Sequence, residues 1–378
     1  MGSLRHSVDV VSSPFDLDIA QRSRDFETEY LDMIRSKLSA SLVCKTWKEY
    51  MAPFLWEVVC LWPGTRFHSI GRLLSRDKVG HYIRVLRLQG SQRWTVFDLA
   101  NVQRILQYCS RLESFILPEP WHAPRVDNQL DAQLATTLRE AHISMLDEAG
   151  IARVLENQNL AILYAHTQHA PPCSQAPDVL LPVLHTLSIR LSDMSSRKIL
   201  APSLQRWILH DLIDDVEYQH LFDYYSPLLR TFESYGYWSD YRVITSILEK
   251  MTNLVELVIQ LNPNDLSAVP HQLPPQLKRL GFTLGDTGYP WVLRGDEATF
   301  VWFRDHLEDW MALAIANAHI LLLIRFLDWD VIKLPPKKLP VRRKSYNRWW
   351  LTCLKSAAMK GIAVQNEKGQ TLEIESDC

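Results

Sequence analysis

The side chains that could do chemistry in this chain are few, and their spacing does not form a catalytic or metal site. His166 and His169 stand at helical spacing, so both imidazoles could face one zinc ion. Zinc needs four tetrahedral ligands, and no carboxylate pair lies near these histidines. Asp214, Asp215 and Glu217 form an acidic cluster without a partner base, which is more typical of a solvated face than of an acid–base pair. We therefore expect no metal ion and no cofactor.

The sequence also lacks the short motifs of common enzyme classes. It contains no Gly-x-x-x-x-Gly-Lys-(Ser/Thr), Gly-x-Gly-x-x-Gly, His-Glu-x-x-His or Gly-x-Ser-x-Gly. The 13 glycines in 378 residues are few for phosphate-binding loops. We expect a protein that is not an enzyme, and catalysis by His166, His210 or Glu233 is the most remote alternative.

Most of the chain repeats one apolar phrase, Leu-x-x-Leu-x-Leu, with conservative replacements. Successive copies are 20 to 29 residues apart, which is the range of leucine-rich repeats. Helix-like segments such as Ala100–Cys109 and Val243–Met251 alternate with the copies. This pattern predicts an α/β leucine-rich-repeat solenoid with parallel strands on the inner wall and helices outside. The nine copies begin at Ile83, Leu112, Leu138, Leu160, Leu184, Leu204, Leu229, Leu254 and Leu277.

Alternation along each strand separates core positions from surface positions. The fourth residue of each phrase should be buried, and we expect one column made of Leu86, Phe115, Leu163, Leu187, Trp207, Phe232, Leu257 and Leu280. The fifth and seventh residues should line the inner wall. Neighbouring strands lie about 4.8 Å apart, so aromatic, cationic and imidazole groups there could form one target-binding patch. An ordinary polar sheet face is the alternative. The patch would contain Tyr164, His166, Arg190, His210 and Tyr235.

Composition excludes some partners. The 41 basic and 43 acidic residues give a net charge of -2, which argues against a nucleic-acid binder. The most apolar window, Trp310–Ile324, is too short to span a membrane and predicts a buried helix entering a tenth strand. Six scattered cysteines without Cys-x-x-Cys indicate reduced thiols, as in the cytoplasm or nucleus. A basic run, Lys337-Lys338 with Arg342-Arg343-Lys344, resembles a nuclear-localisation patch, although a solvated linker is the commoner reading.

The N-terminal part carries a short motif of its own. Leu38, Leu42, Val43, Trp47 and Met51 stand at helical spacing and predict an apolar helix face, after which Pro53 should start a new segment. Residues 41–47 read Ser-Leu-Val-Cys-Lys-Thr-Trp, and residues 53–56 read Pro-Phe-Leu-Trp. These stretches resemble the second half of the F-box family. A helix that merely caps the repeats, with Cys44 as a buried small residue, is the alternative.

The first half of the F-box pattern is degraded. Its usual opening is Leu-Pro-x-Glu-(Ile/Leu), and the nearest match is Pro14-Phe15-Asp16-Leu17, where Ser13 replaces the leucine. The layout is similar to the F-box-like families of mushroom-forming fungi. The expected domains are an F-box-like helical domain over 1–61, a solenoid over 62–330, and a basic linker with a C-terminal cap over 331–378.

The resemblance implies a substrate-recognition subunit of a Skp–cullin–F-box type ubiquitin ligase. A Skp-type adaptor would dock on the helical domain, and an unknown target protein would bind the repeats. Neither nucleic acid nor a membrane is an expected partner. The main alternative is a repeat scaffold that no longer binds the adaptor. The adaptor-binding residues implied by the resemblance are Pro14, Leu17, Leu42, Val43 and Trp47.

Overall fold

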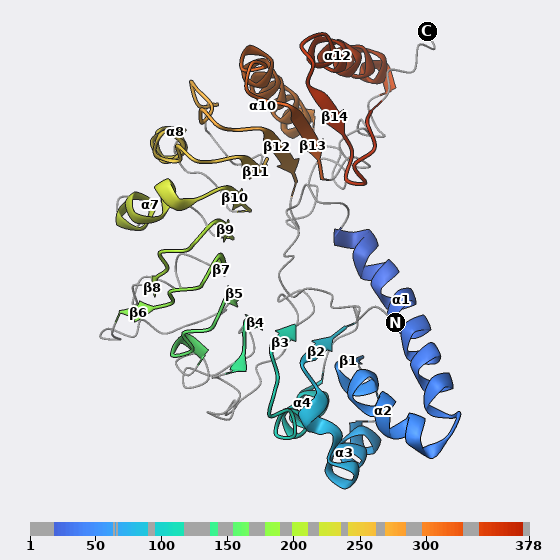
Figure 1. The fold of residues 1–378 in the computed structure, drawn as a ribbon. Helices are drawn as coiled ribbons and strands as arrows, with labels where there is room; N and C mark the ends of the chain where they lie inside the picture. Colours follow the sequence, from blue (N-terminus) through green and yellow to red (C-terminus); the bar gives the residue numbers. More distant parts are fainter. Residues whose placement is uncertain are drawn as a thin grey trace. The chain divides into compact units, whose positions relative to one another are not determined.

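The chain folds into two compact units, whose main parts are Ser23–Leu204 and Gln205–Cys378. Each unit contains a parallel sheet, and described helices lie between several of its successive strands (Figure 1). Within the part of the chain described here, no helix is long and apolar enough to cross a bilayer. The computed structural model describes residues 19–62, 65, 67–89, 95–116, 137–142, 154–165, 178–189, 199–210, 219–235, 241–261, 269–284, 297–327 and 340–372.

The first unit begins with two helices, α1 (Ile19–Ser41) and α2 (Lys45–Trp56). Its sheet has the strand order β1-β2-β3-β4-β5-β7, and each of these neighbouring strands pairs in parallel with the next. The strands β6 (Val179–Leu180) and β8 (Ile199–Leu200) form a separate two-stranded parallel sheet. The remaining elements are β1 (Val58–Leu61), α3 (Phe67–Asp77), the 3₁₀ helix η1 (Val79–Tyr82), β2 (Val85–Leu88), α4 (Val96–Leu106), β3 (Ser114–Ile116), β4 (Glu140–His142), β5 (Ile162–Ala165) and β7 (Thr186–Ile189).

The second unit repeats this alternation with longer helices toward its end. Its strands follow the order β9-β10-β11-β12-β13-β14, again all parallel. The elements are β9 (Arg206–Leu209), α7 (Gln219–Tyr225), the 3₁₀ helix η5 (Ser226–Leu228), β10 (Thr231–Ser234), α8 (Tyr241–Lys250), β11 (Glu256–Gln260), β12 (Arg279–Thr283), α10 (Glu297–Ala316), β13 (Leu323–Phe326), α12 (Pro340–Met359) and β14 (Ala363–Gln365).

The fourth residue of the repeated phrase is buried in every strand where we expected it. All eight predicted core side chains are at most 4% exposed. The strand register also aligns them, since Leu86 pairs with Phe115 in the first unit and Trp207 pairs with Phe232 in the second. The rings of Phe222 and Tyr225 pack on Trp207 at 5.0 and 5.1 Å between centroids. The repeat phase read from the sequence is therefore confirmed, as is the expected strand at Leu323–Phe326.

The predicted continuous helix over Leu38–Met51 is wrong, because the chain turns at residues 42–44. Cys44 is fully extended, with φ -162° and ψ 171°, and so separates α1 from α2. Pro53 does not start a new segment but lies inside α2. Proline lacks the N–H that would bond one turn earlier, so α2 continues at the loss of one helical hydrogen bond.

Two further elements begin earlier than the sequence indicated. Strand β1 falls inside the expected helical domain 1–61 but pairs in parallel with β2, with Val58 opposite Val85. Helix α12 starts at Pro340, within the basic segment that we expected to be a linker. Proline suits the first position of a helix because its missing N–H would have no helical partner there.

Candidate docking surface on α1 and α2

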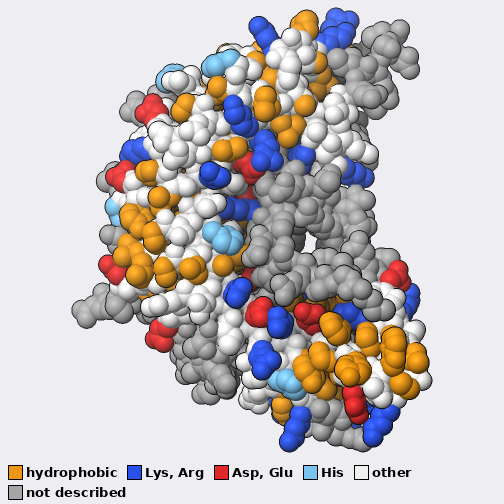
Figure 2. All heavy atoms as spheres, in the orientation of Figure 1, with side chains coloured by type: hydrophobic (Ala, Val, Ile, Leu, Met, Phe, Trp, Pro, Cys, Tyr) orange, Lys and Arg blue, Asp and Glu red, His pale blue; other side chains and the backbone are white. Residues whose placement is uncertain are grey.

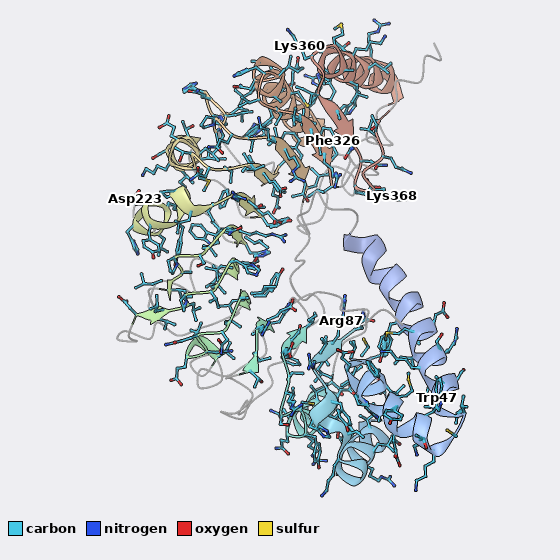
Figure 3. The ribbon with its side chains drawn as sticks, in the orientation of Figure 1. Trp47, Arg87, Asp223, Phe326, Lys360 and Lys368 are labelled. Atoms are coloured by element: carbon cyan, nitrogen blue, oxygen red, sulfur yellow. The ribbon has the colours of Figure 1, made fainter. Side chains whose placement is uncertain are left out.

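Helix α2 carries large apolar side chains that it does not bury. None of its residues is buried. Trp47, Tyr50 and Phe54 are three and then four residues apart, which places them on one face of the helix. Their exposed fractions are 45%, 73% and 50%. Figure 2 shows hydrophobic side chains gathered in the region of this helix, and Figure 3 labels Trp47 close to the turn between α1 and α2. Single exposed apolar residues are ordinary, but a gathering of this kind is typical of surfaces that contact another molecule.

The turn between the two helices extends the same apolar character. Leu42 and Val43 are 82% and 67% exposed, and Leu38 in the last turns of α1 is 44% exposed. Backbone hydrogen bonds fix the turn, since the N–H of Leu42 donates to the Leu38 oxygen at 3.1 Å and that of Val43 to the Ala40 oxygen at 3.2 Å. We define the α1–α2 surface as Leu38, Leu42, Val43, Trp47, Tyr50 and Phe54.

Tyr30 anchors α1 to the sheet. Its hydroxyl accepts a hydrogen bond from the Cys60 N–H at 3.2 Å and donates to the Val58 oxygen at 3.4 Å. Its ring lies 6.1 Å from that of Trp62. Burial, aided by the charge of Cys60, raises the pKa of Tyr30 to about 12, so the hydroxyl remains a donor at ordinary pH. The helix that carries part of the α1–α2 surface is thus fixed to β1.

Lys37 links the two helices beyond their turn. Its ammonium Nζ donates to the backbone oxygen of Phe54 at 2.6 Å. That oxygen belongs to the last turn of α2, where carbonyl groups have no helical partner and attract cations. Partial burial lowers the pKa of Lys37, and the charge of Glu57 opposes this shift. A hydrogen bond between α1 and α2 therefore helps to hold the α1–α2 surface in place.

The structure places three of the five predicted adaptor-binding residues on this surface. Leu42, Val43 and Trp47 are all exposed, while Pro14 and Leu17 lie outside the described residues. Cys44 is also exposed, which contradicts the reading of a buried small side chain. Tyr50 and Phe54 were not predicted as site residues, although their helical spacing from Trp47 was a usable signal.

The predicted target-binding residues are described only in part. In the second unit the rings of His210 and Tyr235 stack with centroids 5.3 Å apart and planes at 12°. In the first unit Tyr164 packs on His142 at 4.3 Å and 30°. His166 and Arg190 lie outside the described residues. The structure thus brings His210 and Tyr235 together and gives Tyr164 a partner that the predicted patch did not include.

A buried carboxylate lies beside the His210–Tyr235 stack. Glu233 is 1% exposed, and its Oε1 accepts hydrogen bonds from Nε and Nη2 of Arg206, each at 2.6 Å. The hydroxyl of Tyr235 donates to its other oxygen at 2.8 Å. Both oxygens of Glu233 are occupied by this chain's own donors. This arrangement stabilises a charge in the interior and does not present a free base, as the enzyme alternative would need.

The first unit contains a similar cluster around Glu140. Ser114 donates its hydroxyl hydrogen to Oε2 of Glu140, and Nε2 of His142 lies 3.7 Å from Oε1. Burial raises the pKa of Glu140, but His142, Ser114 and the charge of Arg87 together outweigh it, so the net pKa is below the ordinary value. Burial lowers the pKa of Arg87, which Figure 3 labels on β2. The Glu140 carboxylate is thus also stabilised by side chains of this chain.

The described residues offer no metal centre. They contain no group of three or more His, Cys, Asp or Glu side chains that could hold an ion. Cys60, Cys109 and Cys353 are buried. Burial raises the pKa of Cys109 to about 12 and that of Cys353 to about 11, with Glu308 adding to the latter. The thiols of Cys109 and Cys353 therefore stay protonated and are poor nucleophiles or metal ligands. His166 and His169 lie outside the described residues.

No protein-family model matches the chain, and no curated protein matches it at a significant level.

Proposed function

We propose that this chain is the substrate-recognition subunit of a Skp–cullin–F-box type ubiquitin ligase. In this proposal α1 and α2 form an F-box-like domain that docks a Skp-type adaptor, and the parallel repeats form a leucine-rich-repeat solenoid that holds a target protein. The protein would bind its partners in the cytoplasm or nucleus and do no bond chemistry itself. The observation that carries the proposal is the exposed α1–α2 surface, whose Leu42, Val43 and Trp47 belong to the stretch that resembles an F-box.

The composition of the surface supports docking. Large aromatic side chains bury roughly 150–250 Å² each on contact, and Trp and Tyr are frequent hot spots of interfaces. Trp47, Tyr50 and Phe54 supply three such rings on one helix face. The cations Lys45 and Lys48 are also exposed on α2 and would form part of a polar rim. A partner that covered this face would remove the exposed apolar area from water.

The adaptor test is a double substitution, Leu42→Asp with Val43→Asp. Both side chains are more than half exposed, so the variant should fold with a melting temperature near that of the wild type. Buried aspartates at the interface should raise the Kd for a purified Skp-type adaptor by at least about thirtyfold. Isothermal titration calorimetry gives the affinity. Phe97→Asp is the matched control, since Phe97 is 74% exposed on α4 and lies outside the α1–α2 surface.

One observation keeps the scaffold alternative open. Residues 21–29 of α1 are mainly polar, where the family's first half is expected to be apolar. If the chain is only a scaffold, the wild-type protein should have folded repeats but show no measurable adaptor binding. That result would overturn the ligase proposal in favour of the scaffold.

The target side of the proposal needs its own test. Arg190→Ala combined with Tyr235→Ala should remove one specific protein from the set captured from cell extract and identified by mass spectrometry. Tyr235 also donates a hydrogen bond to buried Glu233, so Tyr235→Phe is the control for that lost bond. An unchanged set of captured proteins would move the target site away from the predicted patch.

A further inference from the structure

The first strand of the sheet has an outer edge that needs a partner. Strand β1 is the first in the strand order, and β2 is its one neighbour among the described strands. The groups on its β2 side are bonded, since the Val85 N–H donates to the Glu57 oxygen at 3.0 Å and the Gln89 N–H to the Leu61 oxygen at 2.8 Å. The Val58 oxygen and the Cys60 N–H belong to the other side. Main-chain groups on the outer side of an edge strand are a template for pairing with another chain when nothing else bonds them.

The Tyr30 hydroxyl occupies both of these edge groups. In a parallel pair, one residue donates its N–H to the oxygen of the residue before its opposite number and accepts from the N–H of the residue after it. The hydroxyl of Tyr30 donates to the Val58 oxygen at 3.4 Å and accepts from the Cys60 N–H at 3.2 Å. One side-chain group therefore makes the two bonds that a strand residue opposite Val59 would make.

None of the four residues of β1 is of a kind that blocks pairing, and three of them are buried by the folded chain: Val59, Cys60 and Leu61 are 7%, 6% and 0% exposed. The sequence of β1, Val-Val-Cys-Leu over residues 58–61, is apolar and β-branched in its first half and contains no charge and no proline. Charged residues and prolines are the usual means of blocking an edge, and segments without them are prone to pair with copies of themselves. The identical strand of a second molecule is thus the natural occupant of the edge when Tyr30 leaves it.

We propose that Tyr30 is an edge cap, which takes the place of a strand residue and prevents β1 from pairing with β1 of a second copy of this chain. The ring contact with Trp62 at 6.1 Å helps to hold the hydroxyl in place. Burial raises the pKa of Tyr30 from 10.0 to about 12, which extends the bond to the Val58 oxygen to a more alkaline pH than an ordinary tyrosine would allow. The same helix carries Leu38 and leads into the turn, so a displaced α1 would lose the α1–α2 surface and free the β1 edge together. This inference rests on α1 and β1 alone and not on the proposed function.

The test removes the hydroxyl and keeps the ring. In Tyr30→Phe the Cys60 amide should exchange with solvent roughly fivefold faster, because one hydrogen bond contributes about that factor. Sedimentation equilibrium should show self-association that grows with protein concentration in Tyr30→Phe, and more strongly in Tyr30→Ala. The wild type and Tyr50→Phe, which changes an exposed tyrosine of α2, should remain monomeric.

A third variant shows whether the association uses this edge. Adding Val58→Lys to Tyr30→Phe should restore the monomer, since a lysine on an edge strand opposes pairing. The proposal is overturned when Tyr30→Phe leaves Cys60 exchange unchanged, when it stays monomeric at all concentrations, or when Val58→Lys has no effect on its association. Because Tyr30→Phe retains the ring, the result does not depend on whether Tyr30→Ala folds.

Discussion

The helices at the two ends of the chain treat their apolar side chains in opposite ways. Near the C-terminus, α12 buries Trp350, Leu354 and Ala357, which are 5%, 7% and 0% exposed. Near the N-terminus, α2 buries none of its residues. A helix that only closes a sheet turns its apolar stripe inward. Because α2 turns Trp47 and Phe54 outward, its apolar face is better explained as a surface for another protein than as a cap.

The edge strands beside these helices differ as well. The outer side of β14 is paired by the chain itself, with an antiparallel bridge between Gln365 and Thr371 and a bond from the Leu372 N–H to the Val364 oxygen at 2.8 Å. The side chain of Asn366 holds the connecting turn by accepting from the N–H of Gln370 at 2.9 Å. At β1 the Tyr30 hydroxyl bonds the Val58 oxygen and the Cys60 N–H. Main-chain pairing closes the C-terminal edge, whereas a side-chain hydroxyl makes the corresponding bonds at the N-terminal edge.

The largest effect should come from removing the central ring of the C-terminal cap. Trp350 packs edge-on against Phe326, with centroids 5.1 Å apart. Trp350→Ala leaves a cavity in a buried site, and such changes cost about 3–5 kcal/mol in the free energy of unfolding. Urea unfolding followed by circular dichroism measures this loss.

Trp47→Ala is the matched substitution in α2. Trp47 is 45% exposed, so its removal should change the free energy of unfolding by less than about 1 kcal/mol. It should instead weaken adaptor binding, as expected for a ring at an interface. Equal losses of stability in the two variants would show that α2 is an ordinary cap and would contradict the comparison.

An acid-sensitive step is expected in the second unit. His306 on α10 accepts a hydrogen bond at Nε2 from the Trp310 indole at 3.3 Å, which requires that nitrogen to be unprotonated. Burial lowers the pKa of His306 from 6.5 to about 4. The unfolded chain therefore takes up a proton more readily below pH 6.5. The free energy of unfolding should fall as the pH drops from about 6.5 to about 4, by about 1–3 kcal/mol.

His306→Gln keeps a polar side chain but cannot titrate, so its stability should depend less on pH over this window. Subtracting the two pH profiles removes the contribution of carboxylates such as Glu140, which titrate in both proteins. For Tyr30 in α1 the pH dependence of stability has the opposite sign. The pKa of Tyr30 is raised from 10.0 to about 12, so its contribution is complete below pH 10 and lost as the pH rises toward 12. Identical profiles for wild type and His306→Gln would contradict the assignment.

The sequence predicted the interior well because the repeat phase is a local pattern. Leu257 and Trp207 could be placed in the core from the spacing of the phrase alone, and both are fully buried. The break at Leu42–Cys44 could not be seen, since it contains no glycine or proline and the apolar spacing continues across it. Strand β1 was missed because residues 58–61 were read as the end of the helical domain.

Periodicity also cannot say which way an apolar face points. The spacing of Trp47, Tyr50 and Phe54 is equally compatible with a core and with a docking surface, and the exposed fractions decide between them. Tyr30 is a single tyrosine in a mainly polar helix, and no pattern connects it with β1, which is 28 residues away along the chain. Such a contact is visible only once the fold places α1 against the sheet edge.

The smallest expected effect concerns the link between α1 and α2. Lys37→Met keeps the aliphatic stem but removes the donor to the Phe54 oxygen. The bond is partly exposed to solvent, so its loss should lower the free energy of unfolding by only about 0.5–1 kcal/mol. The bond should also set the angle between the two helices that form the surface. Adaptor affinity should therefore fall several-fold, which is more than so small a loss of stability would cause. Lys360→Met, at an exposed lysine that follows α12 and is labelled in Figure 3, removes the same charge without touching the α1–α2 surface. Calorimetric titration of both variants with the adaptor separates the effects, and equal affinities would show that the α1–α2 surface does not depend on Lys37.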